Sequence, residues 1–118
     1  MKLKEIAEIL SLKPLTPAEG PDLEREVSGA YVGDLLSDVM ANSEDGNIWI
    51  TLQTHVNIVA VATLKNLSAI VIVNGRMPES DTLDRAVSED IPILLTGKSA
   101  FETAGKLYRI LNARNLQG

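Results

Sequence analysis

The sequence predicts a three-layer α/β/α domain built around a mostly parallel sheet of four or more strands. Three apolar segments typical of strands begin at residues 47, 68 and 91, and each is followed by a segment typical of a helix. Their apolar residues run continuously instead of alternating with polar ones, as in parallel strands covered on both faces. A chain of 118 residues can bury a substantial core. We therefore expect residues 1–118 to form a single domain.

The first third of the chain is less regular than the rest. Residues 2–11 carry apolar side chains at helical spacing and predict an amphipathic helix. Prolines and glycines in residues 14–21 predict an irregular stretch, with a short extended piece at residues 15–16. Residues 26–32 suit a strand, and Asp34 is placed to cap the next helix. That helix contains Leu35, Leu36, Val39 and Met40.

From residue 47 onward, predicted strands and helices alternate. The predicted strands are residues 47–52, 68–75 and 91–97. The predicted helices are residues 54–66, 79–90 and 99–115. Residues 54–66 are rich in β-branched side chains, but adjacent parallel strands need a crossover of a dozen or more residues, which is usually helical.

The predicted helix at residues 54–66 is apolar nearly all round, so it must be buried against the sheet and against a second surface. We therefore expect a two-fold homodimer. The candidate interface residues are Val56, Ile58, Val59 and Ala62. The alternative is that the N-terminal helix covers this face.

Composition excludes several classes of function. The formal net charge is −5 and no basic run occurs, which argues against nucleic acid or an anionic membrane as a partner. The chain has no cysteine and His55 is its only histidine, which excludes disulfides, thiolate catalysis and a multi-histidine metal centre within one chain. Its N-terminus does not resemble a secretory signal, and no apolar stretch approaches the ~20 residues of a membrane helix. We expect a cytoplasmic protein with no cofactor and no metal.

The segment Thr96-Gly97-Lys98-Ser99 resembles the end of a phosphate-binding loop. Such a loop needs a glycine five positions before its Gly-Lys-Ser, because its backbone amides must wrap the phosphates. Pro92 stands at that position, and residues 93–96 belong to a predicted strand. Ser99 followed by Glu102 is instead a capping box for the last helix. The sequence therefore predicts a helix cap and no nucleotide-hydrolysing loop.

Small, hydroxyl-bearing and cationic residues follow each predicted strand. In a parallel sheet these residues meet at the carboxyl edge, where ligands of open α/β sheets bind. Such groups near helix N-termini suit an anion. The candidate ligand-binding residues are Asp34, Thr54, His55, Asn74, Gly75, Arg76, Thr96, Gly97 and Lys98. The alternative is that these residues only form turns, with Arg76 in solvent or paired with Glu79.

Three runs of the sequence together resemble DRTGG domains: VSGAYVGDLLSDVM, NIWITLQTHVNIVAVATLKNLSAIVIVNGRMPES and IPILLTGKSAFETAGKLYRIL. The resemblance covers roughly residues 26–111. It is strongest at the Gly33-Asp34 step, at AIVIVNG and its proline turn, and at IPILLTGKSAFETA, where Lys98-Ser99-Ala100-Phe101 replaces the usual polar-aromatic sequence. The resemblance implies an α/β domain related to the N-terminal domains of HPr kinases and Mur ligases. In such proteins this unit is not the catalytic part, accompanies CBS pairs or enzyme domains, and has a regulatory or ligand-sensing role.

Three functional hypotheses follow. The first is a non-catalytic regulatory domain that binds a small anionic ligand or a partner protein. The second, from another class, is a small hydrolase or transferase that uses His55, Thr54 and Asp34. The third is a purely structural assembly subunit.

Overall fold

The computed structural model describes residues 1–17 and 22–117 of the chain, with side chains described up to Ala113. The elements follow one another as α1 (Leu3–Ile9), β1 (Lys13–Pro14), β2 (Gly29–Val32), α2 (Leu36–Asn42), β3 (Asn47–Thr51), α3 (Asn57–Leu64), β4 (Ala69–Ile72), α4 (Ser80–Ser88), β5 (Ile93–Leu95) and α5 (Ala100–Gln117). In this described part, no helix is both long and apolar enough to cross a membrane.

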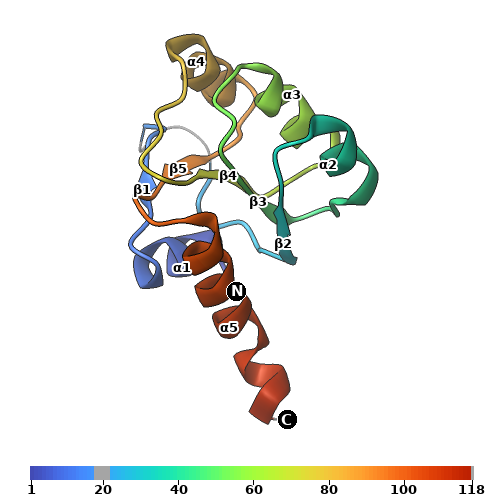
Figure 1. Ribbon diagram of the computed structural model, residues 1–118, viewed down its shortest axis with the longest axis vertical. Helices are drawn as coiled ribbons and strands as arrows, with labels where there is room; N and C mark the ends of the chain where they lie inside the picture. The colour runs from blue at the N-terminus through green and yellow to red at the C-terminus, as the bar shows by residue number, and fades with distance from the viewer. Residues whose placement is uncertain (18–21, 118) are drawn as a thin grey trace.

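The strands form one five-stranded sheet in the order β1-β5-β4-β3-β2 (Figure 1). Strands β2, β3, β4 and β5 are parallel, and β1 joins β5 in the antiparallel direction. In the register of the central strands, Ile50 lies opposite Val71, and Ile72 lies opposite Leu95. The predicted α/β class with a mostly parallel sheet is therefore confirmed.

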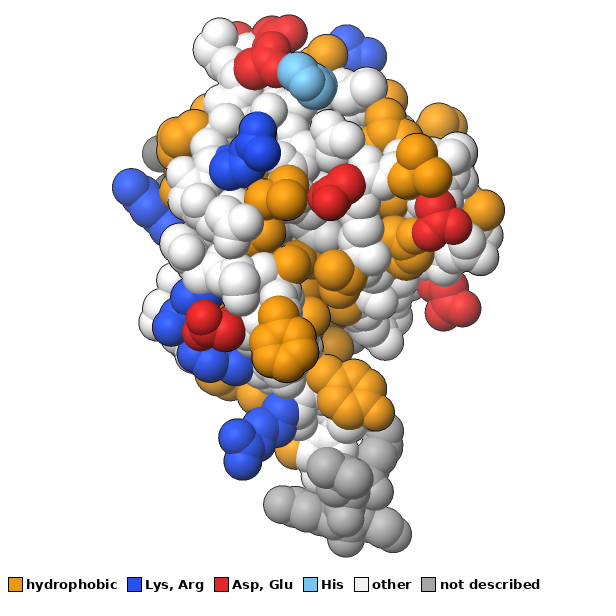
Figure 2. All heavy atoms as spheres, in the orientation of Figure 1, with side chains coloured by type: hydrophobic (Ala, Val, Ile, Leu, Met, Phe, Trp, Pro, Cys, Tyr) orange, Lys and Arg blue, Asp and Glu red, His pale blue; other side chains and the backbone are white. Residues whose placement is uncertain are grey.

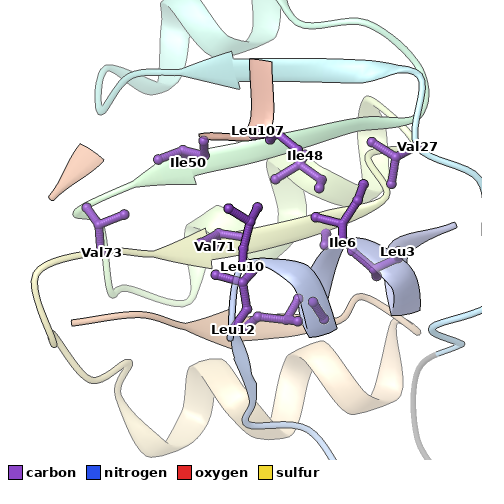
Figure 3. Close-up of a cluster of buried hydrophobic side chains, with 13 residues drawn as sticks. Leu3, Ile6, Leu10, Leu12, Val27, Ile48, Ile50, Val71, Val73 and Leu107 are labelled. Carbon is purple, nitrogen blue, oxygen red and sulfur yellow. The ribbon is translucent and has the colours of Figure 1, made fainter. Parts of the chain in front are cut away.

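Helices cover both faces of the sheet, which explains the continuous apolar runs of its central strands. One face packs against α1 and α5 in a cluster that includes Leu3, Ile6 and Leu107 (Figure 3). The other face packs against α2, α3 and α4. Every residue of β3 and β4 is buried as a consequence.

Helix α3 receives its second cover from within the chain. It packs on the sheet with α2 on one flank and α4 on the other, and these contacts cover most of the apolar surface that predicted a dimer. Ala60 and Leu64 remain exposed. Ile58, Val59 and Ala62 have no exposed surface, and Val56 alone of the four candidate interface residues is exposed. The buried surface of α3 therefore gives no reason to expect a dimer through this helix. Helices α2 and α4 cover it, and α1 lies on the other face of the sheet.

The N-terminal region differs from its prediction in one respect. The extended piece predicted at residues 15–16 lies at Lys13–Pro14, although the Leu15 N–H also donates to the Ile93 carbonyl at 2.8 Å. This pairing with β5 is a long-range contact that local composition does not specify. Residues 18–21 of the predicted irregular stretch lie outside the described residues.

Candidate functional site

The loops that follow the four parallel strands meet at the carboxyl edge of the sheet, as predicted, and hydrogen bonds join neighbouring loops. The Asn74 N–H donates to the Lys98 carbonyl at 2.9 Å, and the Gly75 N–H donates to the Thr96 carbonyl at 2.9 Å. The loops after β4 and β5 are therefore held side by side. Their predicted site residues Asn74, Gly75, Arg76, Thr96, Gly97 and Lys98 form one local group.

The loop after β4 is a tight turn that presents Arg76. Asn74 and Gly75 have φ values of 60° and 68°, and the Arg76 N–H donates to the Val73 carbonyl at 3.3 Å. Positive φ at both central residues is the mark of a type I′ turn, for which Asn-Gly is the preferred sequence. The Arg76 side chain is exposed, and no ion pair between described residues uses it.

Lys98, in the loop after β5, lies near Lys106 on α5. The Thr96 hydroxyl accepts a hydrogen bond from the Lys98 N–H at 3.2 Å and fixes the start of this loop. The pKa of Lys106 on α5 lies below its ordinary value, first because its side chain is within hydrogen-bonding reach of Lys98, and second because the two like charges repel. Glu102 opposes this shift. Sequence reasoning missed Lys106, which follows Lys98 by eight residues across the start of a helix.

The Ser99 side chain caps α5, as predicted. Its hydroxyl accepts a hydrogen bond from the Glu102 N–H at 3.1 Å, which is the first half of a capping box. Residues 93–95 before it are strand β5, so no glycine-rich loop wraps this segment. This geometry agrees with the helix-cap interpretation of Thr96-Gly97-Lys98-Ser99.

Asp34 does not cap α2, and this prediction was wrong. Leu35 occupies the N-cap position, and no side chain caps the helix there. The Asp34 carboxylate instead accepts hydrogen bonds from the Thr51 hydroxyl and the Leu52 N–H, both at 2.8 Å. The carboxylate therefore ties the loop after β2 to the loop after β3, and this structural role accounts for Asp34 without a ligand.

Among the described residues, no hydrogen bond joins His55, Thr54 and Asp34, the residues of the hydrolase or transferase hypothesis. His55 Nδ1 pairs with the Glu79 carboxylate, while Asp34 is engaged by Thr51 and Leu52. The Thr54 carbonyl accepts hydrogen bonds from the Glu79 N–H at 3.2 Å and from the Thr82 hydroxyl at 2.8 Å. Glu79 is thus the partner of His55, and these contacts hold α4 against the loop after β3.

Comparison with known proteins gives a structural likeness without a sequence match. No protein-family model matches the chain, and no curated protein matches it. A crystal structure of the CBS and DRTGG domains of the regulatory region of Clostridium perfringens pyrophosphatase, complexed with the activator diadenosine tetraphosphate, superimposes with a TM-score of 0.64. The sequences are 19% identical, and the match covers 90% of this chain and 45% of that one.

The two folds are alike. At 19% identity the comparison supports a shared fold, which is consistent with the DRTGG resemblance found in the sequence. The chain spans less than half the length of the solved regulatory region.

Proposed function

We propose that residues 1–118 form a DRTGG-like regulatory domain that senses a small anionic ligand at the carboxyl edge of its sheet. The observation that carries this proposal is the meeting of Lys98 and Lys106 beside the turn that presents Arg76. Two lysines lie together here, with Glu102 nearby, in a chain whose formal net charge is −5. Folding alone gives no reason to place two lysine side chains against each other.

An anion would satisfy these groups chemically. Phosphate or carboxylate oxygens accept hydrogen bonds from ammonium groups, and a negative charge between Lys98 and Lys106 removes their mutual repulsion. The Arg76 guanidinium offers a planar pair of donors that fits a phosphate or a carboxylate. The Asn74-Gly75 turn holds the start of Arg76 in a fixed conformation, which lowers the entropy lost on binding.

The structural comparison suggests which anions to test first. The solved regulatory region is complexed with diadenosine tetraphosphate, which is described as its activator. A nucleotide polyphosphate carries several negative charges and is long enough to contact both the lysine pair and the loop that carries Arg76. Nucleotide polyphosphates are therefore the first ligand class to test on this chain.

A thermal-shift and calorimetric titration tests the proposal. The ligands are ATP, diadenosine tetraphosphate and inorganic pyrophosphate, with uncharged adenosine as the matched control ligand. A true ligand at one hundred times its Kd adds about 2.7 kcal/mol to the free energy of unfolding. We expect Arg76→Ala and the double variant Lys98→Ala/Lys106→Ala to remove most of this gain.

The matched control variant is Lys4→Ala, because Lys4 is an exposed lysine on α1 outside the loops of the site. It should bind the anion as the unmodified chain does. Binding that survives in the double variant, or that Lys4→Ala weakens as much, would place the ligand elsewhere or reduce it to general charge attraction. Absence of any shift would favour the partner-protein hypothesis.

A further inference from the structure

A groove of about 650 Å³ lies between β2 and α5, on the opposite side of β2 from α2. None of the residues that line it belongs to the cationic group at the carboxyl edge. All of the side chains that line the groove are uncharged. They include Ala30 and Val32 from β2 and Phe101, Ala104, Tyr108 and Leu111 from α5.

Two aromatic side chains on α5 flank this groove in an exposed position. Phe101 is 89% exposed and Tyr108 is 72% exposed. The two residues are seven positions apart, which places them on the same face of the helix two turns from each other. Figure 2 shows hydrophobic side chains gathered along α5 and the adjoining part of the sheet. A large exposed apolar patch of this kind marks an interaction surface.

Strand β2 borders the groove and is an edge strand of the sheet. The Gly33 N–H donates to the Ile50 carbonyl on the β3 side, at 3.1 Å. Because backbone groups alternate in direction along a strand, the N–H and C=O groups of Ala30 and Val32 point to the open side. The strand contains neither a charged residue nor a proline, the usual means of blocking an open edge.

We propose that the surface formed by β2 and the Phe101–Tyr108 face of α5 binds a second copy of this chain. The β2 strands of the two copies pair in the antiparallel direction across a two-fold axis. The two sheets then become one continuous sheet, and α5 of each copy lies beside α5 of the other. The homodimer expected from the sequence is thereby assigned to this surface and not to α3.

Charge and symmetry favour a second copy over another partner. In a two-fold interface the same patch meets itself, so each charged side chain would approach its own copy and repel it. The groove has no charged side chain to cause such repulsion, although the chain carries a formal charge of −5. An edge strand is also complementary to itself when it pairs in the antiparallel direction. The uncharged groove offers no counter-charge to a strongly basic or acidic partner.

The exposed aromatic side chains supply part of the area that a dimer needs. Phe101 and Tyr108 together can contribute roughly 300 Å² of exposed area per copy, since an aromatic side chain buries about 150–250 Å². A standard interface needs about 800 Å² per partner. The groove walls, the edge of β2 and the length of α5, which is about 27 Å at 1.5 Å per residue, extend beyond the two rings. In Figure 1, the C-terminal part of α5 projects beyond the sheet.

Cross-linking tests the geometry directly, because the chain has no cysteine of its own. We expect Val32→Cys, treated with a short bismaleimide at micromolar protein concentration, to give a covalent dimer. The matched control is Leu64→Cys, because Leu64 is 73% exposed but lies on α3. The control should stay monomeric on a denaturing gel.

Sedimentation of charged variants tests the energetics. Val32→Lys and Tyr108→Glu each place like charges against each other across the two-fold axis and should weaken the dimer at least tenfold. Leu64→Lys should leave the dimer unchanged, and circular dichroism establishes that all three variants are folded. A monomeric unmodified chain would overturn the proposal, as would a dimer that resists both Val32→Lys and Tyr108→Glu. Binding of extended peptides by a monomeric chain would assign the edge to another partner.

Discussion

The two edges of the sheet end in chemically different ways. At one edge, β1 has two residues, Lys13 and Pro14, both exposed. Proline cannot donate a backbone hydrogen bond, and lysine is the charge most often used to block an edge. At the other edge, β2 has four residues, Gly29–Val32, with no charge and no proline. The chain therefore blocks one edge of its sheet by composition and leaves the backbone groups of the other edge unblocked.

The two edge strands also differ in how the chain holds them. The main chain attaches β1 to β5 through the pairing of Lys13 with Leu95 and Pro14 with Leu94. The end of β2 is additionally anchored by side chains of β3. The Trp49 indole N–H donates to the Gly33 carbonyl at 2.8 Å, and the Thr51 hydroxyl donates to Asp34 at 2.8 Å. The strand at the open edge, β2, is therefore held in place by side chains of its neighbour β3.

The largest expected effect concerns the Trp49 anchor. Trp49 is fully buried, so Trp49→Ala should lower the free energy of unfolding by about 3–5 kcal/mol. Trp49→Phe keeps one aromatic ring but loses the donor to Gly33 and part of the buried ring volume, so we expect a smaller loss of about 1–2 kcal/mol. Urea unfolding followed by circular dichroism at fixed protein concentration measures both. Equal losses in the two variants would contradict a separate contribution from the ring.

The second effect concerns the Asp34 anchor. Asp34→Ala leaves the buried Thr51 hydroxyl and the Leu52 N–H without their acceptor, which should cost about 2 kcal/mol. The matched control is Asp38→Ala. The Asp38 carboxylate accepts hydrogen bonds from the Asn42 side-chain amide and from the Tyr31 hydroxyl, and both bonds lie at the surface. We expect the control to lose less than half as much in the same unfolding experiment. A larger loss in the control would make α2, and not the Asp34 carboxylate, the main anchor of β2.

The third prediction removes one of the two differences between the edges and leaves Pro14 in place. Lys13→Val removes the charge that blocks β1 and should let this edge associate as well, which light scattering at increasing concentration would record as species larger than a dimer. The free energy of unfolding should change by no more than about 0.5 kcal/mol, since Lys13 is exposed. If the variant keeps the size of the unmodified chain, the charge of Lys13 is not what protects this edge.

The smallest effect concerns charge, because the charged side chains are also distributed differently between the two sides of the sheet. The cations Lys98 and Lys106 lie near the end of β5, whereas the groove beside β2 is uncharged. Because Lys98 lowers the pKa of Lys106 in the folded chain, the unfolded chain binds more protons at alkaline pH, just below the ordinary lysine value. Stability from this group therefore rises with pH in that window.

Lys98→Ala should raise the pKa of Lys106 toward its ordinary value and remove this rise. Nuclear magnetic resonance titration of the lysine side chains measures the change, with Lys4→Ala as the control that leaves Lys106 unaffected. A Lys106 pKa that does not respond to Lys98→Ala would mean that the two ammonium groups are apart in solution.

Local signals in the sequence determined the layout of the fold and part of the site. The apolar runs that begin at residues 47, 68 and 91, each followed by a helical segment, predicted buried parallel strands, because helices on both faces of such a sheet hide these runs from water. The Asn74-Gly75 turn and the Ser99 cap were also predictable, because each depends on residues within a few positions of one another.

Contacts between distant segments decided the rest, because the sequence does not specify which side chains will meet across the fold. The position of Asp34 before a helix predicted a cap, but its carboxylate accepts hydrogen bonds from Thr51 and Leu52 instead. Helix α3 finds its second cover in α2 and α4, so an apolar sequence that indicated a dimer is satisfied within one chain. The approach of Lys106 to Lys98 depends on the direction in which α5 leaves the sheet. The open edge of β2 exists only because the strand order places β2 last, and strand order is a property of the whole sheet.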